Sequence, residues 1–94
     1  MELPIDLQHF IEASFAPGDW PKAFALLASA RIETGEPASA RMLRCAAFAS
    51  QGDLPRLQRY VSLLAVDWRD VILAGEYELH DKVTVQVRDL TRPL

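Results

Sequence analysis

The sequence predicts an all-α fold of four or five antiparallel helices, arranged as a helical-hairpin array or bundle and followed by an extended C-terminal tail with a β pattern. Half of the 94 residues are hydrophobic and 24% are charged, which is the balance of one small folded domain. Apolar side chains recur at helical spacing in five segments, approximately residues 5–15, 20–34, 37–51, 54–66 and 68–79. We therefore expect a helical domain over residues 1–80 and a tail over residues 81–94.

Glycine, aspartate and proline separate the five segments. Gly18-Asp19-Trp20-Pro21 and Gly52-Asp53-Leu54-Pro55 share one pattern. In each, the glycine can end a helix in the left-handed conformation, the aspartate can cap the next helix, and the proline falls in its first turn. At Gly35-Glu36-Pro37 we expect the second helix to end and the third to begin, and we expect Asp67 to cap the fifth segment.

The apolar stripes of the five segments define an expected core. The third segment is rich in alanine, which lets neighbouring helices approach closely. In the fifth segment, the apolar run 71–73 is compatible with a strand as well as with a helix. The expected core residues are Phe10, Ile11, Phe24, Leu27, Leu43, Ala46, Ala47, Leu57, Val61, Leu64, Val71 and Ile72.

The tail changes from the helical period to the period of a strand. Val83, Val85 and Val87 alternate with polar residues. Because an isolated strand has no backbone partners, it is not stable alone. The tail is therefore expected to pair with another copy or another protein, or to lie extended along the helices.

The two Gly-Asp-x-Pro marks are each followed by a basic residue and begin 34 residues apart. Over roughly residues 18–79, this spacing resembles the tetratricopeptide repeat, whose helical hairpins recur about every 34 residues. Arg41 and Arg44 stand where that family favours a large aromatic residue and a leucine. The resemblance implies a helical-hairpin array of that general shape, not membership of the family.

Catalytic and metal-binding patterns do not emerge from the sequence. His9 and His80 are distant in sequence and have no ligand cluster beside them, and we expect both at the surface. Cys45 is the single cysteine, so it cannot form an internal disulfide, and we interpret it as a small buried side chain. No nucleophile motif or phosphate-binding glycine loop is present. We expect no enzyme activity, no cofactor and no metal.

Four arginines form the candidate partner-binding site. If the third and fourth helices make an antiparallel hairpin, these side chains can form a basic strip for an acidic protein segment or a phosphate backbone. In the alternative, each is solvated or pairs with an acid such as Glu33 or Glu36. The four residues are Arg41, Arg44, Arg56 and Arg59.

These observations favour a small non-catalytic protein-interaction module, an adaptor built from helical hairpins. The alternative is a regulatory or nucleic-acid-binding domain that uses the arginines, although a net charge of −3 argues against nucleic acid. The partner is expected to be another protein or a second copy in a homodimer. Residues 1–6 carry acids where a signal peptide carries bases, and no apolar run reaches the ~20 residues of a membrane span, so we expect a cytoplasmic protein.

Overall fold

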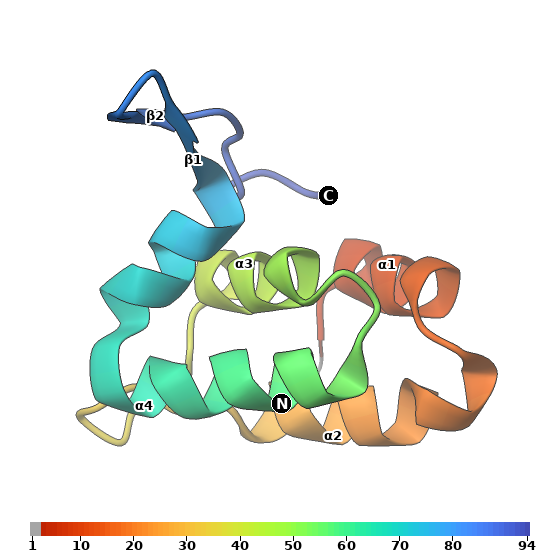
Figure 1. Ribbon diagram of the computed structural model, residues 1–94. Helices are drawn as coiled ribbons and strands as arrows, with labels where there is room; N and C mark the ends of the chain where they lie inside the picture. The colour runs from red at the N-terminus through yellow and green to blue at the C-terminus, as the bar shows by residue number, and fades with distance from the viewer. Residues whose placement is uncertain (1–2) are drawn as a thin grey trace.

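The computed structural model describes residues 3–94 as a mostly helical fold with a small sheet near the C-terminus. Two layers make up the helical body: α1 and α3 lie in one, and α2 and the first part of α4 lie in the other (Figure 1). The prediction of a mostly helical chain is confirmed, but the sheet lies outside an all-α class. The elements are α1 (Ile5–Ser14), the 3₁₀ turn η1 (Pro17–Asp19), α2 (Trp20–Ser29), α3 (Ala40–Ser50), α4 (Leu54–Glu76), β1 (Tyr77–His80) and β2 (Val83–Gln86).

The core forms where the apolar stripes of the helices converge between the two layers. Nine of the twelve expected core residues are buried, and the remaining three, Phe10, Phe24 and Val61, pack partly exposed against them. Helix α3 packs closely against the end of α4. A Cβ at Gly75 would lie 2.5 Å from the Cβ of Cys45, so only glycine fits there without a shift.

The two Gly-Asp-x-Pro marks have different structures. At the second mark Gly52 has φ +76°, and a carboxylate oxygen of Asp53 accepts a hydrogen bond from the backbone of Arg56 at 3.2 Å, as predicted. At the first mark α2 begins at Trp20 with Pro21 in its first turn, as predicted, but the other two parts of the prediction are wrong, because α1 ends earlier, in extended backbone, and Asp19 makes no side-chain cap. A 3₁₀ turn intervenes there, and the indole of Trp20 bonds back to the end of α1 at 2.9 Å.

Helix α2 ends at Ser29 rather than at residue 34, and α3 begins at Ala40 rather than at residue 37. The intervening chain doubles back on itself through a bridge between Arg31 and Pro37, with Gly35 at φ +87° in the turn. Backbone hydrogen bonds across this loop take the place of helical ones, so the expected stop and start at residues 35–37 is wrong. The hydroxyl of Ser39 instead caps α3.

Helix α4 is bent at Asp67, whose φ of −153° and ψ of 94° are not helical. Its carboxylate accepts a hydrogen bond from the backbone N–H of Arg69 at 3.1 Å and so starts the second part of the helix. The predicted boundary between residues 66 and 68 is confirmed. Residues 71–73 are helical, so the strand alternative is wrong for them, and the helix ends at Glu76 rather than at residue 79.

The predicted strand over the tail exists, but its partner is the chain itself. β2 pairs in antiparallel register with β1, which was expected to be helical. Asp81 and Lys82 form the two-residue turn with φ values of 49° and 66°, and positive φ at both positions suits the twist of a hairpin. The expected division between residues 80 and 81 falls at the start of this turn, directly after β1. The hairpin projects from the end of α4, and the chain then returns toward α1 and α3 (Figure 1).

Candidate functional site

A buried carboxylate, Glu76, fastens the C-terminal segment to the helical body. Its side chain is 0% exposed. Arg41 of α3 donates two hydrogen bonds to it, at 2.7 and 2.8 Å. The amide of Gln86 donates to the same carboxylate at 3.0 Å, and the backbone N–H of Leu90 donates at 3.1 Å. One side chain at the end of α4 therefore fixes α3, β2 and the chain beyond β2 together.

The charges around Glu76 set the protonation of its neighbours. The two hydrogen bonds from Arg41 hold the pKa of Glu76 below its ordinary value, although burial opposes this shift. The thiol of Cys45 lies 3.9 Å from the carboxylate, and burial together with that negative charge raises the pKa of Cys45 to about 12. Cys45 is therefore a buried thiol with little thiolate at neutral pH, which is unsuited to nucleophilic chemistry.

A second ion pair holds the chain end against α1. Arg44 of α3 donates to both carboxylate oxygens of Asp6, at 3.0 and 3.3 Å. Its remaining nitrogen donates to the carbonyls of Leu90 and Thr91 at 3.4 Å. The backbone N–H of Leu94 donates to Asp6 at 3.1 Å. The hydrogen bonds from Arg44 hold the pKa of Asp6 below its ordinary value, so the pair is ionic at neutral pH.

The hairpin that these anchors hold carries an exposed apolar surface. Val83 is 60% exposed, Val85 is 42% exposed and Val87, which continues the alternation, is 40% exposed. We call these three residues the valine face. Val85 lies opposite Glu78 and Val83 opposite His80 in the register, so these two polar side chains share the face. Leu79, which is 72% exposed, lies on the other face of the ribbon.

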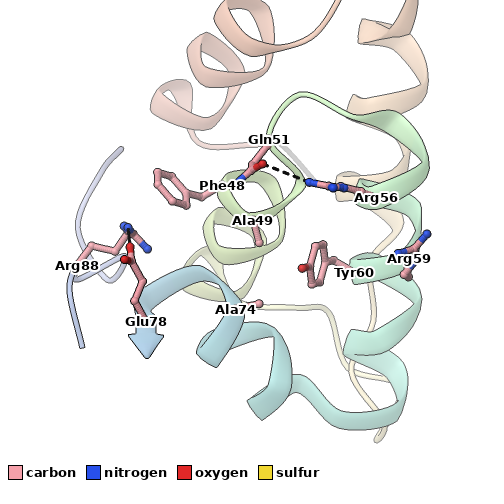
Figure 2. Close-up of a pocket in the computed structure, with 9 residues that line it drawn as sticks. All are labelled: Phe48, Ala49, Gln51, Arg56, Arg59, Tyr60, Ala74, Glu78 and Arg88. Atoms are coloured by element: carbon pink, nitrogen blue, oxygen red, sulfur yellow. Dashed lines mark hydrogen bonds and ion pairs between the residues drawn. The ribbon is translucent and has the colours of Figure 1, made fainter. Parts of the chain in front are cut away.

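A cleft of about 740 Å³ opens beside the base of the hairpin. The bend at Asp67 separates the two parts of α4, and α3 forms the floor between them (Figures 1 and 2). The small side chains of Ala49 and Ala74 leave space in the cleft. We call it the arginine cleft, since three arginines line it together with two aromatic rings and one acid: Arg56, Arg59, Arg88, Phe48, Tyr60 and Glu78.

The arginines of the cleft differ in how firmly they are held. The guanidinium of Arg88 lies 4.2 Å from the ring centre of Phe48, and it donates to Glu78 at 2.6 Å and to the carbonyl of Gly75 at 2.7 Å. Arg56 bonds to Gln51 at 3.2 Å (Figure 2) and lies 3.9 Å from Asp53. Arg59 makes no side-chain hydrogen bond or ion pair with the rest of residues 3–94.

The four arginines proposed from the sequence therefore divide into two pairs rather than forming one strip. Arg41, which is partly exposed, and Arg44, which is buried, bind acids of the chain itself, Glu76 and Asp6. Arg56 and Arg59 line the cleft, and a partner-binding role stays a prediction for them. The division follows from tertiary structure, because the end of α4 places Glu76 beside Arg41, while α1 and the returning chain end place Asp6 and two backbone carbonyls around Arg44.

Sequence reasoning missed Glu76, Asp6 and Arg88. A signal existed for Glu76, which follows Ile72 by four residues and so lies on the buried face of the same helix. No comparable signal marked Asp6, since its partner Arg44 lies 38 residues away. Arg88 likewise had no local signal, because its contact with Phe48 depends on the docking of the tail.

The fold and the site together define a small, mostly helical protein that presents a hairpin beside a cationic cleft. Comparison with protein-family models, with curated proteins and with solved structures gives no match. Within residues 3–94, no three histidines, cysteines or acids gather as a group that could hold a metal ion. None of the helices in this range has the length and apolar character needed to cross a membrane.

Proposed function

We propose that the protein is a small non-catalytic protein-interaction module that binds its partner through the C-terminal hairpin. The observation that carries this proposal is the exposure of the valine face on a hairpin that the ion pairs of Glu76 and Asp6 hold to the body. Exposed apolar side chains that are grouped, rather than scattered singly, are typical of interaction surfaces.

The backbone of the hairpin supports the same function. Within residues 3–94 each strand has one neighbour, so the outer edge of each carries unpaired N–H and C=O groups. An extended segment of a partner can add to such an edge, with main-chain hydrogen bonds supplying affinity. Because the hairpin is already anchored, binding would not have to order it, and a preorganised surface binds with a smaller loss of entropy.

The alternative of a nucleic-acid-binding or regulatory domain has weaker support. Arg41 and Arg44 have acidic partners within the chain, so two of the four proposed cations are engaged. The chain as a whole has a net charge of −3.

The partner can also be a second copy of the chain. In that case, the protein would self-associate through the hairpin. The proposal keeps the expected cytoplasmic location, where the free thiol of Cys45 would stay reduced.

The test replaces the apolar surface without disturbing the fold. A Val83→Thr, Val85→Thr double variant keeps β-branched side chains in β2 but removes two exposed apolar groups. The matched control is Val66→Thr, which changes another exposed valine on α4. Tagged wild-type and variant proteins would be used to capture partners from the source cells, and sedimentation velocity would measure self-association.

We expect the double variant to lose a stoichiometric partner, or its own dimer, while the control retains it. Equal recovery of every captured protein by wild type and double variant, with both monomeric, would contradict the proposal. Deleting residues 81–94 is a poorer test, because it would also remove buried Leu90 and the backbone donor that Leu90 gives to Glu76.

A further inference from the structure

The valine face and the arginine cleft form one continuous surface. Glu78 belongs to both, since it lies opposite Val85 in the hairpin and also lines the cleft. Arg88, which directly follows Val87, closes the same side of the cleft (Figure 2). A segment seated on the valine face can therefore extend into the cleft without leaving the surface of the protein.

The cleft carries positive charge on an acidic protein. Its one acid, Glu78, is paired with Arg88 at 2.6 Å. Arg56 shares its charge with half-exposed Asp53 at 3.9 Å, and Arg59 is unpaired within residues 3–94. The chain as a whole has a net charge of −3, so this local excess of cations is opposite in sign to the rest of the molecule. Guanidinium groups in such a setting are complementary to carboxylates.

We infer that the partner segment is an acidic peptide that places apolar side chains on the valine face and carboxylates in the arginine cleft, against Arg56 and Arg59. This inference rests on the proposed function and specifies the chemistry of the partner. The setting of Phe48 favours a peptide over nucleic acid. Arg88 lies over the ring of Phe48, and Phe10 stacks against the same ring with 6.2 Å between centres, so two side chains of the protein already occupy the positions that a stacked base would take on Phe48.

Selection from a random peptide library tests this composition directly. A library of displayed peptides, each about 12 residues long so that it can span both parts of the surface, would be selected on the full chain at low salt. We expect enrichment of sequences that combine apolar residues with Asp and Glu, and weaker binding of synthesised winners at higher salt. In a parallel experiment, a fluorescein-labelled single-stranded oligonucleotide would be titrated with the same protein.

Two charge-reversal variants distinguish binding in the arginine cleft from a general effect of the protein's net charge. Arg59→Glu and Arg31→Glu change the net charge equally, but Arg31 is an exposed residue outside the cleft. We expect Arg59→Glu to lower the affinity for an enriched acidic peptide by about tenfold or more. Arg31→Glu should change that affinity by less than about twofold. Arg56→Gln, which removes one charge without adding another, should give an intermediate loss.

Several outcomes would overturn the inference. The first is that the selected peptides are not enriched in acidic residues. The second is that Arg59→Glu and Arg31→Glu lose equal affinity for an acidic peptide. The third is that the oligonucleotide binds more tightly than any peptide and that this binding is lost in Arg59→Glu. The proposed function fails separately. A cellular partner could be lost in the Val83→Thr, Val85→Thr variant but retained by Arg59→Glu. This result would support the interaction module and reject the acidic partner segment.

Discussion

The helical body and the C-terminal segment are held together by different forces. The body buries a continuous set of apolar side chains in which Leu7, Ile11, Leu27, Leu43, Leu57 and Leu64 are almost wholly inaccessible. Beyond Glu76, the only buried apolar residue is Leu90, and the segment is fixed instead by hydrogen bonds to Glu76, Arg44 and Asp6. Burial of apolar area is non-directional, whereas these charged hydrogen bonds define one geometry.

The difference indicates how a short segment with little apolar content can hold a fixed position. A buried ion pair adds little net stability compared with apolar residues of the same volume, but removing one partner is costly because the other charge is left without its counterpart. The C-terminal segment should therefore respond to charge and pH, while the body responds to loss of volume.

The largest effect is expected from Glu76→Ala. This change leaves Arg41 without its counter-charge and removes acceptors for Gln86 and Leu90. We expect a loss of about 3–5 kcal/mol in the free energy of unfolding, measured by urea denaturation. The control Glu33→Ala, at an exposed position, should change stability by less than about 0.5 kcal/mol. A similar small change in both variants would show that the buried carboxylate does not hold the segment.

Within the body, Leu27→Ala is expected to cost about 2–4 kcal/mol, because the side chain is fully buried. Val61 was expected in the core on the same grounds as Leu27. In the structure Val61 is only partly buried, so Val61→Ala should cost about 1–2 kcal/mol. The two variants should also leave the hydrogen-exchange protection of the hairpin amides close to that of wild type. An equal cost at both positions would contradict the packing of α2 and α4 described above.

Where α3 packs against the end of α4, Gly75→Ala is expected to cost about 1–3 kcal/mol through overpacking. The added Cβ would lie 2.5 Å from that of Cys45, and neither backbone can move without displacing α3 or α4. Gly18→Ala is the matched control, because nothing lies within 4 Å of the position that its Cβ would occupy. Thermal unfolding of the two variants side by side would measure the difference, and an unchanged or raised Tm for Gly75→Ala would refute the close packing.

Low pH should loosen the attachment of the C-terminal segment before it unfolds the helical body. The pKa values of Glu76 and Asp6 are lowered in the folded protein by Arg41 and Arg44, so each carboxylate adds stability above its ordinary pKa. That stability is lost as the pH falls below about 4.5, the ordinary value for glutamate, and toward the lower folded-state values. Stability measured between pH 7 and pH 3 should fall less steeply for Asp6→Asn than for wild type. Parallel curves would mean that Asp6 and Arg44 do not form the ion pair in solution.

Much of the helical body could be predicted from the sequence, because its apolar stripes and local caps report on contacts within a few residues. The Gly52–Asp53 turn, the boundary at Asp67 and most of the core illustrate this. The loop between α2 and α3 could not be predicted, since the bridge of Arg31 to Pro37 replaces helical hydrogen bonds that the local sequence also favours.

The candidate site was less predictable, because it depends on contacts between distant parts of the chain. The alternation of valines predicted a strand at β2, but its partner β1 continues the sequence of a helix and has no strand pattern of its own. The arginines were recognised as a group, yet two of them meet acids 35 and 38 residues away. Pairing over such separations is decided by the tertiary fold and leaves no periodic signal in one sequence.

In this structure Glu76 holds the hairpin and the chain after it in one fixed position. Amide hydrogen exchange of wild type and Glu76→Gln, measured residue by residue at neutral pH, would test this role of Glu76. We expect the amides of Val87 and Leu90, which donate to the backbone and side chain of Glu76, to be protected in wild type. In Glu76→Gln, Leu90 should lose protection while the amides of α3 keep theirs. Rapid exchange of both amides in wild type would show that Glu76 does not hold the segment in place.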